Sequence, residues 1–245
     1  MQSLTRWVHG RLLAFYGRPR WPAKYEPLDE LVGTILSQHT SDINSERAFA
    51  SLKRAFATWE SVRDAPAHEL VEAIRAGGLA VVKAQRIQAV LRALTNDHAR
   101  VELQDLRGMR RQAAVDLLTA LPGVGRKTAA CVLLFGAHVP ALPVDTHVHR
   151  VSLRLGLAPQ RATPEATADL LEAALDPRQY YAFHVNLIRL GREICKAPRP
   201  RCEICPLQVR CASAGAAALR TSRGGRRYTA SRSSASRAAP ASNSA

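Results

Sequence analysis

Residues 121–127 read Leu-Pro-Gly-Val-Gly-Arg-Lys and lie between two apolar segments with helical spacing, 111–120 and 126–136. Pro122 is expected to stop the first helix, because its ring clashes with the preceding turn. We expect Gly123 and Gly125 to adopt backbone angles closed to other residues and to leave the backbone accessible. The N–H groups at the next helix start can then hold a phosphate without reading bases. An ordinary helical hairpin is the alternative, but a basic pair follows at once, so the predicted phosphate contacts are Gly123, Val124, Gly125 and Arg126.

Lys127 is predicted to lie in the first turn of the second helix. The positive end of the helix dipole and the neighbouring Arg126 disfavour an ammonium group there, and a neutral amine is a nucleophile. A solvated lysine that contacts phosphate is the alternative. Residues 144–150, Val-Asp-Thr-His-Val-His-Arg, place a single acid at the expected start of another helix. Asp145 is either the N-cap of that helix or the anion that a positively charged transition state requires.

Four of the five cysteines are close together near the end of the chain, with the spacing C-x6-C-x2-C-x5-C. Four thiolates suit either zinc or an iron-sulfur cluster. Zinc sites usually pair two tight C-x2-C elements, and the wide, unequal gaps here favour the bulkier cluster. Two disulfides are a further alternative, which needs an oxidising compartment. The predicted metal ligands are Cys195, Cys202, Cys205 and Cys211, whereas Cys131 lies in an apolar segment and is predicted to be a buried thiol.

The chain of 245 residues is 47% hydrophobic and carries a formal charge of +15. It is therefore folded for most of its length, and its charge points to a polyanionic partner such as nucleic acid. Residues 212–245 contain six arginines and no acid, and we expect a disordered basic tail there. No stretch reaches the apolar length of a membrane span, and the N-terminus lacks a secretory signal. We expect a cytoplasmic protein associated with the bacterial nucleoid.

The apolar pattern predicts an all-α fold. Residues 28, 31, 32, 35 and 36 are apolar at the spacing of a half-buried helix, and no segment sustains the alternation of a strand. Leu4, Val8, Leu12 and Phe15 recur at the same spacing and predict an N-terminal helix that docks by this stripe. Further helices are predicted at 42–56, 67–76, 83–95, 111–120, 126–136, 145–156, 164–175 and 179–191.

Three motifs resemble, in order and spacing, the endonuclease III family of DNA glycosylases: Leu-Pro-Gly-Val-Gly-Arg-Lys-Thr-Ala, Val-Asp-Thr-His and the cysteine set. The resemblance covers about residues 25–211. It implies a helix-hairpin-helix glycosylase fold with a six-helix domain over residues 28–140, in which the hairpin occupies about 114–136. A second domain would combine residues 1–27 and 141–211 and hold a [4Fe-4S] cluster.

The resemblance also implies a bifunctional DNA glycosylase/AP lyase of base excision repair that removes oxidised pyrimidines. Its partner would be double-stranded DNA with damaged bases or abasic sites, bound by a monomer. The damaged nucleotide would be flipped out of the duplex. Lys127 would attack C1′ and form a Schiff base that permits β-elimination, and Asp145 would stabilise the positive charge of the transition state.

Two further DNA contacts follow from the resemblance. Leu79, after two glycines, is similar to the family's apolar wedge beside the flipped nucleotide, although a core leucine is the alternative. Residues 36–42, Leu-Ser-Gln-His-Thr-Ser-Asp, depart from the family's usual Leu-Ser-x-Gln pattern. His39 stands where a glutamine enters the vacated stack, and Gln38 stands one residue earlier. Which of the two fills the gap is left open by the sequence.

Two alternative functions remain. An adenine or mismatched-thymine glycosylase would share the hairpin and the cluster, but such relatives typically lack the nucleophilic lysine. A noncatalytic DNA-binding module would use the same elements for docking only. The presence of both Lys127 and Asp145 favours an enzyme over that module.

Overall fold

A computed structural model describes residues 2–21, 26–95, 98, 100–103 and 106–214. Over these residues the chain is helical, with no strand and a single β-bridge between Thr95 and Val101. The predicted all-α class is therefore confirmed. The predicted basic tail lies outside the described residues from 215 onward. Within the described ranges, no helix is both long and apolar enough to cross a membrane.

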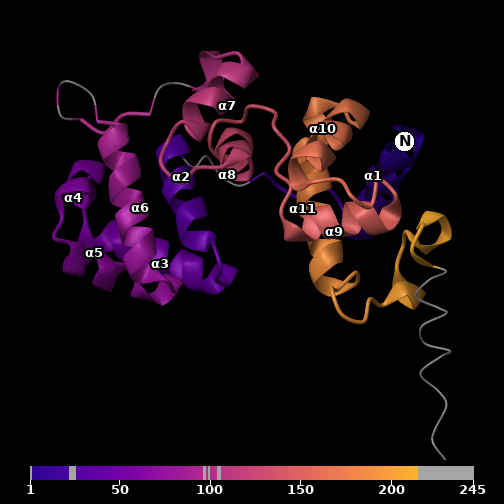
Figure 1. Cartoon of the computed structure of the whole chain (residues 1–245). Helices are drawn as coiled ribbons and strands as arrows, with labels where there is room; N and C mark the ends of the chain where they lie inside the picture. Colours follow the sequence, from indigo (N-terminus) through magenta and orange to yellow (C-terminus); the bar gives the residue numbers. More distant parts are fainter. Residues whose placement is uncertain (1, 22–25, 96–97, 99, 104–105, 215–245) are drawn as a thin grey trace, which may run out of the picture.

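The helices form two groups, each around its own hydrophobic core. The first group, on the left in Figure 1, surrounds a core with the fully buried side chains Leu31, Ile35 and Leu52. Its elements are α2 (Pro27–Ser37), α3 (Asp42–Ala55), α4 (Trp59–Asp64), α5 (Ala67–Ala73), η1 (Arg75–Gly77), α6 (Ala80–Ala93), η2 (Leu106–Gly108), α7 (Arg111–Thr119) and α8 (Arg126–Cys131), followed by the π turn η3 (Val132–Gly136).

The second group joins the two ends of the described chain. Val8 and Leu12 of the first helix pack into the same core as Phe183, and Asn186 Nδ2 donates a hydrogen bond of 3.0 Å to the Gly17 carbonyl. Figure 1 shows the N-terminal helix beside the last long helices. The elements are α1 (Gln2–Tyr16), α9 (Thr146–Leu155), α10 (Pro164–Ala174), η4 (Pro177–Gln179), α11 (Tyr180–Glu193), η5 (Cys202–Ile204) and η6 (Gln208–Arg210).

The segment that follows α8 contributes to both cores. Leu133 packs in the first core and the adjacent Leu134 in the second, both within the π turn. A Cβ at Gly136 would lie 2.9 Å from the Pro27 Cα atom, so only glycine permits this close approach to α2. The expected single helix over 126–136 is thus interrupted after Cys131. Because this segment bridges the two cores, the start of α8 lies at the junction of the two helical groups.

One helix was missed from the sequence. α4 has only six residues, too few for an apolar period to be recognised. Its start is defined by a reciprocal pair of hydrogen bonds: Ser61 N–H donates to Thr58 Oγ1 at 3.1 Å, and Thr58 N–H donates to Ser61 Oγ at 3.2 Å. This is a capping box with serine in the place of the usual glutamate or glutamine, so the common signal was absent.

Candidate active site and cluster site

The predicted hairpin turn is present between α7 and α8. Gly123 has φ +72, so the backbone favours glycine there, and a Cβ would lie 2.7 Å from Arg86 Nε and displace that side chain. Gly125 differs from the prediction: its φ of −90 and ψ of 173 are ordinary extended angles. Nothing lies within 4 Å of a Cβ built on Gly125. This glycine therefore leaves open space at the N-terminus of α8 rather than allowing an unusual turn.

Arg126, the first residue of α8, forms an ion pair with Asp169 of α10. The hydrogen bond that Arg126 donates to Asp169 raises the pKa of Arg126 above its ordinary value. Arg111 of α7 makes a parallel contact, with 2.8 Å between its Nη2 and Glu172 Oε2. These pairs line a cavity of about 350 Å³ between α7, α8 and α10. Arg126 therefore also joins the two helical groups, and its contact with phosphate stays a prediction.

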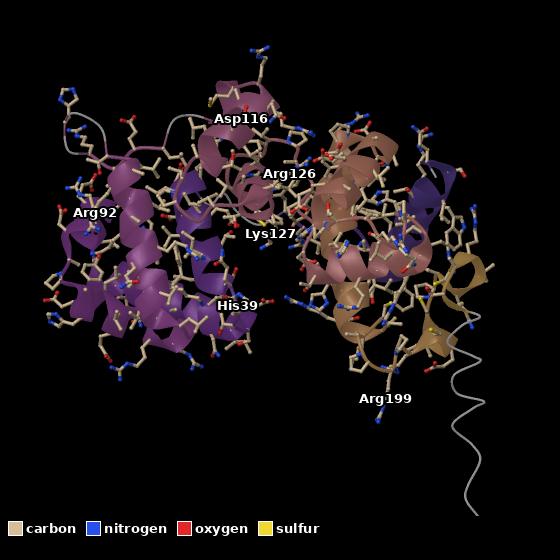
Figure 2. All side chains as sticks on the ribbon, in the orientation of Figure 1. His39, Arg92, Asp116, Arg126, Lys127 and Arg199 are labelled. Atoms are coloured by element: carbon tan, nitrogen blue, oxygen red, sulfur yellow. The ribbon has the colours of Figure 1, made fainter. Side chains whose placement is uncertain are left out.

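Lys127 has an exposed side chain in the first turn of α8 and lies between the two helical groups in Figure 2. Two ionisable groups near Lys127, Cys131 and Glu30, have raised pKa values. Burial raises the pKa of the Cys131 thiol, one turn further along, to about 11, and the charge of Lys127 acts in the opposite direction. Burial likewise raises the pKa of Glu30 on α2 to about 7; Thr34 Oγ1 donates to Glu30 Oε1 at 3.1 Å, and this bond and Lys127 oppose the rise. Glu30 had not been expected near the site.

Asp145 is the N-cap of α9, with its Oδ1 accepting a 2.7 Å hydrogen bond from the Val148 N–H. Behind it lies a buried residue that the sequence analysis missed, His184 of α11, whose Nδ1 is 2.8 Å from the Pro143 carbonyl oxygen. Burial lowers the pKa of His184 to about 4, while the charge of Asp145 acts against the shift and that of Lys127 adds to it. Lys127 and Asp145 therefore lie around the same buried imidazole, which is neutral at pH 7.

The three residues predicted to enter DNA lie at two neighbouring turns. Gln38 ends α2, and His39 follows it with φ +54 and an exposed side chain. Leu79 precedes α6 with φ +48 and is 58% exposed, so it is not the core leucine that the sequence left as an alternative. Val81 and Val82, which follow Leu79 on α6, are also exposed, so the surface around Leu79 is apolar.

The four clustered cysteines line one cavity of about 770 Å³, together with Arg154, Arg199 and Arg201. Burial, together with the other three thiols, raises the pKa of Cys205 to about 11. Four thiolates thus repel one another unless a cationic centre lies among them. Arg154 Nη1 lies 3.4 Å from Cys195 Sγ and supplies a positive charge at the cavity wall. In the part of the chain that the structure describes, no group of three His, Cys, Asp or Glu residues is positioned for a single metal ion.

Comparisons with known proteins agree with this geometry. A family profile described as "HhH-GPD superfamily base excision DNA repair protein" matches residues 32–177. Endonuclease III of Thermotoga maritima is 37% identical over 193 residues, which cover 79% of this chain and 86% of that protein. The chain belongs to the endonuclease III family. Endonuclease III of Rickettsia conorii is 38% identical over 183 residues, covering 74% of this chain and 81% of its own length.

A solved structure of a trapped endonuclease III–DNA covalent intermediate is 29% identical and matches with a TM-score of 0.76, over 88% of this chain and 98% of that chain. The predicted helix-hairpin-helix glycosylase fold is therefore confirmed. As a member of the endonuclease III family, the chain is a DNA-binding enzyme of the DNA glycosylase/AP lyase class. The noncatalytic module is no longer supported.

In this endonuclease III homologue, His184 and Glu30 give opposite pH dependences of the free energy of unfolding. The pKa of His184 falls from 6.5 to about 4 on folding, so the unfolded chain binds the extra proton and stability decreases as pH falls from 6.5 toward 4. The pKa of Glu30 rises from 4.5 to about 7, so the folded state binds the extra proton and stability decreases as pH rises from 4.5 toward 7. Between pH 4.5 and 6.5 the two effects oppose each other.

Glu30→Gln should therefore leave the pH dependence of stability that comes from His184 unopposed. We expect the free energy of unfolding of this variant to fall by about 1 kcal/mol per pH unit between pH 6.5 and 5, more steeply than in the wild type. Urea unfolding at several pH values measures this slope. Glu69→Gln, an exposed glutamate on α5, is the matched control and should follow the wild-type curve. Parallel curves for Glu30→Gln and wild type would show that Glu30 does not titrate in this range.

Proposed function

We propose that this enzyme removes oxidised pyrimidines from double-stranded DNA and cleaves the strand at the resulting site, with Lys127 as nucleophile. The observation that carries the proposal is the placement of Lys127 and Asp145. One lies at the first turn of α8 and the other at the N-cap of α9, and both charges act on buried His184 at the junction of the helical groups. That a lysine and an aspartate from different helical groups act on one buried side chain supports their proposed roles as nucleophile and stabilising acid for a flipped nucleotide.

In the first step Lys127 Nζ gives up its ammonium proton to solvent and attacks C1′ as the N-glycosidic bond breaks. The base leaves with the bonding electron pair and takes up a proton. Positive charge develops on the sugar, and the carboxylate of Asp145 stabilises it electrostatically. His184 contributes by position: its contact with the Pro143 carbonyl holds the backbone two residues before Asp145. Because this imidazole is neutral, it adds no positive charge that would compete for the carboxylate.

In the second step the sugar ring opens and a Schiff base joins C1′ to Lys127 Nζ. This iminium acidifies the C2′ protons; loss of one of them breaks the C3′–O bond and releases the 3′ phosphate. Hydrolysis of the Schiff base then frees the lysine. In this proposal one amine serves both base release and strand cleavage.

Borohydride trapping tests this proposal, because the reductant converts the Schiff base into a stable amine. The full-length protein is incubated with duplexes that carry 5-hydroxycytosine, dihydrouracil or thymine glycol, and with duplexes that carry adenine opposite 8-oxoguanine or thymine opposite guanine. We expect a covalent adduct on the oxidised pyrimidines. Base release on either mismatched duplex, without an adduct on any oxidised pyrimidine, would assign the chain to the alternative adenine or mismatched-thymine activity.

We further propose that Cys195, Cys202, Cys205 and Cys211 hold a [4Fe-4S] cluster. The support is that all four line one cavity, and that burial and the neighbouring thiols raise the pKa of Cys202 and of Cys205, which a cationic centre would offset. When bound, the cluster would cross-link the segment after α11, which has only short 3-10 turns of its own. It would therefore act on the fold of this segment rather than on the bond-breaking steps.

The purified protein should contain about four irons per chain and absorb in the visible range. Cys202→Ala should lose most of this iron, because three thiolates remain for the cluster. Cys131→Ala is the matched control: this thiol is buried on α8 beside Lys127 and does not line the cavity of the four cysteines, so its loss should leave the iron content unchanged. Elemental analysis and the visible spectrum measure both. Zinc in place of iron, with no visible absorbance, would overturn the cluster assignment.

A further inference from the structure

Lys83 of α6 holds two turns together. Its side chain is only 3% exposed, and its Nζ donates hydrogen bonds of 2.7 Å both to the Leu36 carbonyl and to the Gly77 carbonyl. Leu36 lies two residues before Gln38, and Gly77 lies two residues before Leu79. A buried ammonium group with two carbonyl acceptors is costly to displace, because each acceptor would lose a charge-assisted bond. The Lys83 ammonium group thus holds the turns at residues 37–39 and 77–79 next to each other.

Arg86 lies one helical turn further along α6. It joins the turn at residues 37–39 to a third turn, the hairpin turn that contains Gly123. Its Nη1 donates a 2.6 Å hydrogen bond to Gln38 Oε1. The same side chain packs against the hairpin turn, because a Cβ built on Gly123 would lie 2.7 Å from Arg86 Nε. The amide of Gln38 is therefore bonded to a guanidinium that also packs against the hairpin turn.

His39 and Leu79 are the exposed tips of the first two turns. Both have a positive φ, +54 and +48, which costs a non-glycine residue on the order of 1 kcal/mol. Such strain persists where the surroundings enforce it, and it gathers at functional sites. Lys83 supplies that enforcement here through the carbonyl groups just before each tip. Figure 2 shows His39 on the same side of the first helical group as Lys127.

We propose that Lys83 and Arg86 hold the three DNA-facing turns as one unit and thereby present His39, rather than Gln38, to the base left unpaired opposite the flipped nucleotide. Lys83 and Arg86 are positioning residues, and His39 is the residue that determines the opposite-base preference. An imidazole can stack on this base and offers one donor and one acceptor to its edge. The inference rests on the proposed flipping of a nucleotide but not on the identity of the lesion.

The test uses the full-length protein and a duplex with a tetrahydrofuran abasic-site analogue opposite 2-aminopurine, whose fluorescence reports its stacking. Binding of the wild type should change this fluorescence. His39→Ala should remove most of the change and weaken binding about five- to tenfold, the usual loss when a stacking ring is removed. Gln38→Glu should retain it, because a carboxylate at this position keeps a charge-assisted bond to Arg86.

Arg86→Met tests the clasp, by which we mean the hydrogen bonds and contacts through which Lys83 and Arg86 hold the three turns together. Arg86 is chosen because replacement of buried Lys83 would destabilise the fold. With Gln38 released, it can compete for the position of His39, so His39→Ala should cost less in the Arg86→Met background than in the wild type. His68→Ala, an exposed histidine on α5, controls for the loss of an imidazole. Equal effects of His39→Ala in both backgrounds would overturn the clasp. Loss of the signal in Gln38→Glu, with His39→Ala unchanged, would assign the opposite base to Gln38.

This experiment is independent of the proposed function, because the abasic-site analogue contains neither a base to release nor a C1′ that can form a Schiff base. A chain that fails to trap on oxidised pyrimidines but shows the predicted fluorescence pattern would overturn the lesion assignment alone. A chain that traps as expected but shows no effect of His39→Ala would overturn the clasp alone.

Discussion

Lys127→Gln should abolish base release and borohydride trapping, with a fall in single-turnover rate of about four orders of magnitude or more, as expected when a nucleophile is removed. Glutamine has a similar length, but its amide cannot attack C1′. The side chain is exposed, so the fold should be unaffected, with a change in stability within about 0.5 kcal/mol. Single-turnover cleavage of a lesion duplex and thermal unfolding measure the two effects separately.

Lys53→Gln is the matched control for this substitution. It removes the same charge from α3, where the lysine pairs with Asp29 at 3.2 Å and lies over the ring of Trp59. An exposed pair of this kind contributes about 0–1 kcal/mol, so only a small loss of stability is expected, with trapping retained. Normal strand cleavage by Lys127→Gln would show that Lys127 only contacts phosphate and that another amine is the nucleophile.

Asp145→Asn should retain binding to damaged DNA and lose about two to three orders of magnitude in turnover, the usual effect of removing one electrostatic stabiliser of a charged transition state. The geometry makes this substitution informative. Asp145 caps α9 through Oδ1, and asparagine caps helices about as well as aspartate. The start of α9 should therefore survive, while the negative charge is lost.

Asp176→Asn provides the comparison, because Asp176 also caps a helical turn and accepts from the Arg178 N–H at 2.9 Å. It lies at η4, away from Lys127, and its replacement should alter stability slightly without a change in turnover. Binding isotherms, single-turnover rates and thermal unfolding of both variants complete the test. Similar turnover for Asp145→Asn and wild type would limit Asp145 to its capping role.

Local features of the sequence were sufficient for most helices of the fold, except α4 and the π turn, and for the main site candidates. The helical periods, the stop at Pro122 and the acid at the start of α9 are each contained within a few residues, and the structure has a helix boundary at each of these places. The role of Asp145 as a cap follows from its position alone. The cysteine spacing likewise placed four thiols at one cavity, since a short segment cannot carry them far apart.

Contacts between distant segments were not predictable in this way. Glu30 beside Lys127 and His184 behind Asp145 come from other helices, and neither has a neighbour in sequence that marks it as special. The π turn after α8 depends on both cores, because Leu133 packs in the first core and the adjacent Leu134 in the second. The same holds for Arg126, which a local pattern assigned to phosphate and which the fold pairs with Asp169.

The sequence by itself thus determined the all-α class, the helix-hairpin-helix turn, the identity of the nucleophile candidate and the set of four thiols. Only the tertiary structure decided which groups surround Lys127, and that the Gln38 side chain is bonded to Arg86 while the His39 side chain is exposed. The physical reason is the range of the interactions. Periodicity, caps and glycine turns act within about one helical turn of the chain. The bond from Arg86 to Gln38 spans 48 residues and exists only after the helices have packed.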